Sequence, residues 1–163
     1  MSDAHDQVDE FPVFFEKEYR SVVGAVMRAG ASFEDAEDAV SEAMTMAAAR
    51  FDRLKTPGAW VRVVAIRRYT RKRQRDQQRE EKEQERARSA PAAHVDQYRD
   101  LYRLVRAILN ELPPAQRMVM ALTMDGYSCG EIAEMIRSPK ETVRSNLRHA
   151  RRAVAARLWR GGW

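Results

Sequence analysis

The sequence predicts an all-α fold made of two small helical domains joined by a flexible linker. Apolar residues recur at helical spacing along most of the 163 residues, and no segment of useful length alternates as a strand would. Hydrophobic residues amount to 44%, which is enough to form a core, whereas aromatic residues amount to only 8%. The expected parts are an acidic tail over 1–10, a domain over 11–76, a charged linker over 77–96 and a second domain over 97–160.

The first domain is expected to hold three helices. Apolar residues at helical spacing predict the first over 11–27, and the Ala-Gly-Ala sequence at 29–31 breaks it. Ser32 can cap a second helix that continues to about Phe51. A threonine cap followed by Pro57 at the first helical position starts the third helix, which becomes strongly basic towards its end.

The segment from Gln74 to His94 contains no large apolar residue and cannot bury a face. It is interpreted as a linker that is helical at most at its start. Its dense mixed charge also fits an exposed helix supported by i,i+4 pairs, so its conformation stays open.

The second domain contains a pair of helices with two start signals. An amphipathic helix over 98–109 and a helix over 115–124 come first, separated by a Pro-Pro pair. Ser128 with Glu131, and Ser138 with Glu141, then form two potential capping boxes, the second with proline at the first helical position. Starts ten residues apart are typical of a helix-turn-helix unit.

The last helix carries a row of cations. Spacings of three and four place these side chains on one face, while Thr142, Ser145 and Asn146 lie near the start, where a recognition helix meets base edges. The alternative is a solvated basic face with no ligand. The row consists of Arg137, Lys140, Arg144, Arg148 and Arg151.

Two further charged stretches bear on function. The helix after Ser32 has an acidic face that suits a basic partner surface, although a merely soluble acidic face explains it too. The charges over 62–75 are all basic, and Trp60 before them fits a core position better than base stacking. With a net charge of +5, two separate basic stripes indicate two contacts with a polyanion, nucleic acid before membrane.

Other functional classes receive no support. The single Cys129 excludes an internal disulfide and a multi-cysteine zinc site, and the three histidines are scattered. We therefore expect no catalytic residue, no metal and no cofactor. The sequence has neither a secretory signal nor an apolar run long enough to span a membrane, so we expect a cytoplasmic protein without membrane insertion.

Three stretches follow one another along the chain and together carry a resemblance to a known family. They are DAEDAVSEAM from Asp35, the Trp60 helix with its basic end, and the segment from Leu112 to Val154. Together they resemble the extracytoplasmic-function class of bacterial sigma factors, which keep only regions 2 and 4. The resemblance implies that the first domain is region 2 and the second region 4. It also implies a subunit that binds core RNA polymerase and directs promoter-specific initiation, with no chemistry of its own.

The resemblance implies three groups of site residues. Residues expected to bind the coiled coil of the largest polymerase subunit are Asp35, Glu37, Asp38, Val40 and Glu42. Residues expected at the promoter −10 element are Lys55, Trp60, Arg62, Arg67, Arg68 and Arg71. Residues expected at the −35 element are Arg137, Ser138, Lys140, Glu141, Thr142, Arg144, Ser145, Asn146 and Arg148. The polymerase flap and an anti-sigma factor are further expected partners.

The sequence departs from the family pattern in several places: the loop over 51–58 is short, and Ala39 and Met44 replace larger apolar residues. Arg67 stands where the family often has asparagine, and Arg137 stands where the turn usually has glycine. Two other interpretations keep the fold but change the role: a decoy that binds an anti-sigma factor without polymerase, and a stand-alone helix-turn-helix regulator. The full basic stripes disfavour the decoy, and the acidic helix is unexplained by the regulator.

Overall fold

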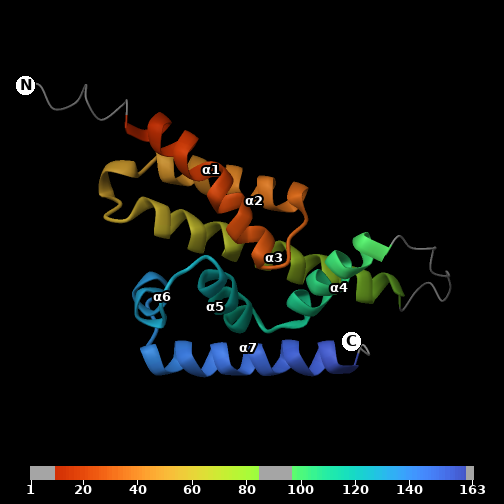
Figure 1. Cartoon of the computed structure of the whole chain (residues 1–163). Coiled ribbons are helices and arrows are strands. Elements are labelled where there is room, and N and C mark those ends of the chain that lie inside the picture. Colours follow the sequence, from red (N-terminus) through yellow and green to blue (C-terminus); the bar gives the residue numbers. More distant parts are fainter. Residues whose placement is uncertain (1–9, 85–96, 161–163) are drawn as a thin grey trace, which may run out of the picture.

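The computed structural model describes residues 10–84 and 97–160, and within these ranges it contains helices and no strands (Figure 1). The predicted all-α class is confirmed. None of the described helices is long and apolar enough to cross a membrane. The α-helices are α1 (Glu10–Arg28), α2 (Phe33–Ala48), α3 (Pro57–Gln84), α4 (Gln97–Glu111), α5 (Pro114–Met124), α6 (Cys129–Ile136) and α7 (Lys140–Arg160), and a 3-10 turn, η1, spans Phe51–Arg53.

Helices α1, α2 and α3 form the N-terminal bundle. Ser32 caps α2 as predicted, because its side-chain oxygen accepts from the backbone N–H of Asp35 at 3.1 Å. Gly30, with φ +100°, lets the chain turn sharply between α1 and α2. The core of the bundle is apolar and includes Val22, Val26, Val40, Met44, Val61 and Ile66, each at most 1% exposed.

Helix α2 ends at Ala48, before the predicted end near Phe51. The chain turns into η1 there, which brings the ring of Phe51 to 5.4 Å from that of Phe11 and 5.2 Å from that of Phe14. Aromatic contacts with α1 therefore end the helix, in a segment without a breaking glycine or proline.

Helix α3 is the longest element, with 28 residues and a length of about 42 Å. It begins at Pro57 as predicted and continues through residues 77–84, the first part of the expected linker. The sequence left two possibilities for the charged linker, a chain that is helical only at its start and an exposed helix, and both allow a helix over residues 77–84. The acidic tail, apart from its last residue, and the rest of the linker lie outside the described residues.

The C-terminal domain consists of α4 to α7. Arg117 of α5 is 3% exposed and donates to three carbonyl oxygens at the end of α4: those of Leu109 at 3.1 Å, Asn110 at 2.6 Å and Leu112 at 3.0 Å. The Leu109 oxygen also accepts from the backbone N–H of Leu112 at 3.2 Å. The last carbonyls of a helix lack partners within it, so the guanidinium caps α4 and ties it to α5. Burial lowers the pKa of Arg117, but arginine remains charged at any working pH.

The two domains pack against each other. In Figure 1, α5 and α6 lie between the N-terminal bundle and α7, and both contact α3. At the opposite end of the contact, the carbonyl oxygen of Gly30 accepts from Tyr69 Oη at 2.8 Å, Asn110 Nδ2 at 3.0 Å and Arg106 Nε at 3.2 Å. A single backbone oxygen thus joins α3 and α4 to the turn between α1 and α2.

Candidate nucleic-acid and protein interfaces

The first helix of the helix-turn-helix pair begins as predicted. Ser128 Oγ accepts from the backbone N–H of Glu131 at 3.3 Å, and Glu131 Oε2 accepts from the backbone N–H of Ser128 at 2.8 Å. These reciprocal bonds form a capping box. Hydrogen bonds from Ser128, through its side chain and its backbone, lower the pKa of the Glu131 carboxyl.

The second start signal was predicted wrongly. Helix α7 begins at Lys140, one residue later than proposed, and no hydrogen bond joins Ser138 to Glu141 in the described structure. The Glu141 carboxylate instead accepts from Arg144 Nη1 at 2.7 Å, one turn further along. The turn before α7 uses Arg137 in the left-handed region, with φ 54° and ψ 52°, so a bulky residue takes a conformation that favours glycine.

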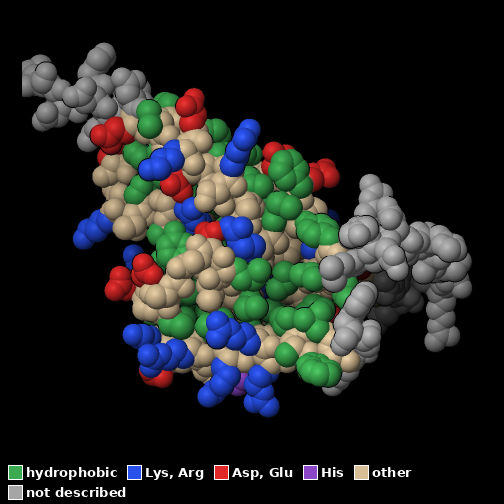
Figure 2. Space-filling model, viewed as in Figure 1, with side chains coloured by type: hydrophobic (Ala, Val, Ile, Leu, Met, Phe, Trp, Pro, Cys, Tyr) green, Lys and Arg blue, Asp and Glu red, His purple; other side chains and the backbone are tan. Residues whose placement is uncertain are grey.

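Helix α7 presents its predicted basic row to solvent. Lys140, Arg144, Arg148 and Arg151 are all exposed, whereas Val143, Leu147 and Ala150 on the other side are buried. Lys and Arg side chains gather over α7 along the lower edge of Figure 2. Near the start of the helix Thr142 is exposed, and Ser145 and Asn146 are half-buried. Helix α7 therefore has an exposed basic face with polar side chains near its start.

The acidic face of α2 is paired with α3. Lys72 Nζ lies 2.9 Å from Asp35 Oδ1 and 3.4 Å from Asp38 Oδ2, and Arg68 Nη1 lies 3.0 Å from Glu42 Oε2. The hydrogen bond from Lys72 lowers the pKa of Asp35, and the same bond raises the pKa of Lys72. These pairs are partly exposed, so a basic partner could compete for the carboxylates.

The cations of α3 divide between two sides of the helix. Arg68 and Lys72 face α2, whereas Arg67 and Arg71 line a cleft of 480 Å³ between α3 and the C-terminal domain. Residues at spacing four share a side and neighbouring residues do not, which explains the division. The residues expected at the −10 element therefore do not form one surface here.

Lys55 and Trp60 line a second cleft, of 640 Å³, with Tyr127, Glu131 and Arg137 on its far wall. Trp60 is half-buried and packs against the core, and the guanidinium of Arg50 lies 5.5 Å from the centre of its ring. Trp60 was expected to be either a core residue or a surface for base stacking. One part of the side chain packs in the core and another part lines the cleft, so the structure is compatible with both.

Arg62 lies in a buried ionic cluster between the domains. Its guanidinium contacts Glu18 Oε2 at 2.8 Å, Ser21 Oγ at 2.7 Å and Asp125 Oδ2 at 2.8 Å, and Asp125 also pairs with Arg28. Burial opposes its charge, but the two carboxylates outweigh burial and raise the pKa of Arg62. Asp125 therefore joins the C-terminal domain to two helices of the N-terminal bundle.

Part of the C-terminal domain matches a known protein family. Residues 102–154 match the family model of sigma-70 region 4. This match lies within the C-terminal domain, which is called region 4 below. No curated protein sequence matches the chain significantly.

Most of the chain also shares its fold with two solved structures. One is the sigma factor RpoE in complex with the anti-sigma factor NepR from Bartonella quintana, with a TM-score of 0.65, 22% identity, and coverage of 91% of this chain and 96% of that chain. The other is CnrH in complex with the cytosolic domain of CnrY, with a TM-score of 0.66, 20% identity, and coverage of 94% of this chain and 89% of that chain. The match to the region 4 model and the shared fold agree with the predicted resemblance to extracytoplasmic-function sigma factors.

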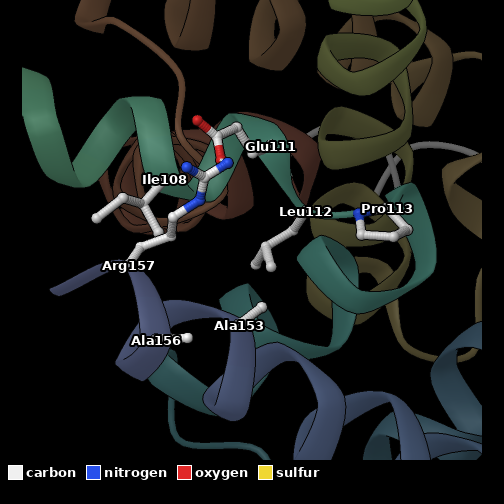
Figure 3. A pocket seen from close by; sticks show the side chains of 7 residues that line it. All are labelled: Ile108, Glu111, Leu112, Pro113, Ala153, Ala156 and Arg157. Carbon is white, nitrogen blue, oxygen red and sulfur yellow. The ribbon is translucent and has the colours of Figure 1, made fainter. Parts of the chain in front are cut away.

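Region 4 also carries an apolar groove that the sequence did not indicate. It has a volume of 270 Å³ and lies between α4 and the C-terminal part of α7 (Figure 3). Ile108, Leu112 and Ala153 supply apolar surface, and an ion pair between Glu111 and Arg157 lies at its edge. Leu104 and Val105, earlier on α4, are also exposed but do not line the groove.

Most of the predicted site residues are exposed or half-buried, with two exceptions. Val40 is fully buried in the N-terminal core, and Arg62 is 8% exposed in the ionic cluster, so neither side chain can reach a partner in this arrangement. Sequence reasoning missed Asp125 and Arg117, whose partners belong to other helices or to backbone carbonyls. Among the described residues, no group of three His, Cys, Asp or Glu side chains could hold a metal ion.

Proposed function

We propose that the chain binds core RNA polymerase and directs promoter-specific initiation by contacting the −10 and −35 elements. The observation that carries the proposal is the exposed row of cations on α7, within a segment that matches sigma-70 region 4. A helix with a basic face and polar residues at its start is suited to the major groove, where side chains meet base edges and phosphates.

In this proposal α7 and the turn before it contact the −35 element. Thr142, Ser145 and Asn146 are near enough to the helix start to meet bases, and the cations further along meet phosphates. Arg144 must release Glu141 to do so, which is a small cost because both side chains are more than half exposed. The remaining members of this contact are Arg137, Ser138, Lys140 and Arg148.

Helix α2 is the proposed contact with the largest polymerase subunit. Asp38 and Glu42 are exposed, and Asp35 and Glu37 lie beside them, half-buried. Val40 supports this face from the core. The apolar groove beside α4 offers region 4 a surface for the polymerase flap, although the flap contact rests on the family resemblance.

The −10 contact requires a change in the arrangement of the domains. Lys55, Trp60, Arg67 and Arg71 all line clefts whose far wall is region 4. A DNA duplex does not fit into clefts of 480 and 640 Å³, so region 4 has to move away from α3 before duplex DNA can occupy that side. Opening of the domain contact is thus part of the proposed mechanism.

Run-off transcription with core polymerase tests this function. The purified chain should direct a discrete transcript from a cognate promoter fragment, identified by selection from a genomic library, and the yield should fall steeply with salt because cations release counterions from DNA. Core polymerase alone is the control. If no fragment of the library supports a discrete transcript although the chain binds core polymerase, promoter recognition is disproved.

An anti-sigma factor is the second proposed partner. One structure that shares the fold is a sigma factor in complex with the anti-sigma factor NepR, and the other, CnrH, is also in complex with a second protein; that is the support for this part of the proposal. A protein that binds this chain and prevents its association with core polymerase in a pull-down would meet the definition. A protein that binds but leaves that association intact would not.

A further inference from the structure

The cleft between α3 and region 4 has features that no contact described so far explains. It measures 480 Å³, which is within the range of small-molecule sites. Its polar lining comes from Arg67, Thr70, Arg71, Gln74, Arg137 and Ser138, and no acidic residue lines it. The cleft therefore has cations on both walls, two on α3 and one in the turn before α7.

The three arginines of the cleft are available for a ligand. Arg67 and Arg71 lie one turn apart on α3, and Arg137 approaches from the turn before α7. None of the three lies within 4.0 Å of a carboxylate in the described ranges, whereas Arg68 on the other side of α3 pairs with Glu42. Guanidinium groups gathered without a counter-charge favour an anion between them.

Thr70 provides an independent observation. It is 6% exposed, it lines the cleft, and its hydroxyl has no hydrogen-bond partner in the described structure. A helical threonine usually donates to the carbonyl four residues earlier, as Thr45 does at 2.9 Å and Thr123 does at 2.8 Å. A buried hydroxyl without a partner is unfavourable, so a ligand that accepts from it would remove that cost.

The amino end of α5 lies at the same cleft. Pro114 and Ala115 line it, and the cap residue Pro113 offers no side-chain acceptor to the free N–H groups of the first turn. Uncapped N–H groups and the helix dipole attract negative charge. The remaining lining is apolar, from Met118 and Ile136, and suits a flat organic group.

From this lining we infer that the cleft is a binding site for a small organic phosphate of about mononucleotide size. The phosphates lie between the arginines and the α5 end, rotation of the Thr70 side chain lets its buried hydroxyl donate to one of their oxygens, and the organic part packs against Met118 and Ile136. Such a ligand joins α3 to region 4, and it occupies the side of α3 that the proposed −10 contact needs. Arg137, unusual in its left-handed turn, is a ligand residue in this arrangement.

The test is a titration of the full-length chain, without DNA or polymerase, with ATP and with inorganic pyrophosphate at constant ionic strength. Both should bind and raise the melting temperature, whereas adenosine, which lacks phosphate, should not. Inability of both phosphate probes to bind at millimolar concentration overturns the inference, whatever the transcription assay shows. Run-off transcription does not require this ligand, so the two proposals fail separately.

Two variants separate a specific site from general charge attraction. Arg137→Gly removes a ligand side chain at a position where glycine is the favoured residue, so the fold is kept, and affinity should fall about 10-fold or more. Arg152→Ala removes an equal charge from an exposed position of α7 outside the cleft and should leave affinity unchanged. Equal loss in both variants would mean nonspecific attraction and would refute the site.

Thr70→Val tests the site without changing its charge, so a loss of ATP affinity in this variant cannot come from weaker electrostatic attraction. Valine has the same shape without the unpartnered hydroxyl, so the variant should melt at the same or a higher temperature without ligand and yet bind ATP several-fold more weakly. Unchanged affinity would exclude Thr70 from the site. If single-stranded DNA binds with the same dependence on Arg137 and Thr70 while ATP does not bind, the cleft is a DNA contact and the small-ligand inference is wrong.

Discussion

Replacing Asp125 by asparagine should open the contact between the N-terminal domain and region 4. The carboxylate is 8% exposed and lies between Arg62, whose side chain is 9% exposed, and Arg28, whose side chain is 33% exposed. Removing one member of a buried ion pair costs about 3–5 kcal/mol of stability. Arg28 is partly exposed, so water can solvate it when its partner is lost, and the expected cost is near the lower end of that range. A loss of about 3 kcal/mol shifts the closed-to-open ratio by more than about 100-fold.

The local effect on α5 should have the opposite sign. Asp125 is the C-cap of α5, where a negative charge is unfavourable to the helix dipole, so asparagine should stabilise the helix itself. The variant should therefore keep its helical content while its domains separate. Small-angle X-ray scattering would show a larger radius of gyration, and energy transfer between labels on α1 and on the end of α7 would decrease.

The matched control is Glu111→Gln. It removes one carboxylate from an ion pair with Arg157 inside region 4, where both side chains are about half exposed, so the domains should stay together. An Asp125→Asn chain with the same radius of gyration and label distance as the wild type would refute the reasoning, as would equal opening in the control.

Three further outcomes are expected. Arg144→Ala should weaken use of the −35 element by about 1–3 kcal/mol in footprinting while polymerase pull-down is unchanged; an equal loss of both would mean that α7 is misassigned. Asp38→Arg should reduce polymerase association in the same pull-down, and unchanged association would contradict the proposed docking face. Because the pKa of Asp35 is lowered from 3.8, its pairing with Lys72 stabilises the fold above that pH, and the contribution is lost as pH falls through the folded-state pKa. The difference in unfolding free energy between wild type and Asp35→Asn should accordingly be present at about pH 7 and shrink towards about pH 3, and a constant difference would exclude this ionisation.

Features that depend on neighbouring residues were predictable from the sequence. The caps at Ser32 and Ser128 and the basic row of α7 follow from spacings of three and four, and the structure has all of them. The cap at Ser138 failed for an equally local reason, because Glu141 can pair with either the cap or Arg144 and spacing does not decide between them.

Contacts between distant residues were not predictable. Arg62 was assigned to DNA because it begins a basic stretch, yet its partner Asp125 lies 63 positions away and looks like an ordinary helix end in the sequence. Likewise, the run of cations on α3 gives no sign that Arg68 turns to α2 while Arg67 turns to region 4. Only the packing of the second domain decides which side of α3 is covered.

The Gly30 carbonyl has a consequence for genetic analysis. Three side chains donate to this one oxygen, and alanine scanning leaves a main-chain oxygen in place. Each single truncation of Tyr69, Arg106 or Asn110 leaves the oxygen with two of its donors, so each variant loses only part of the attachment. Screens of single substitutions will therefore underestimate how firmly this turn holds region 4, and only combined truncations will reveal its full strength.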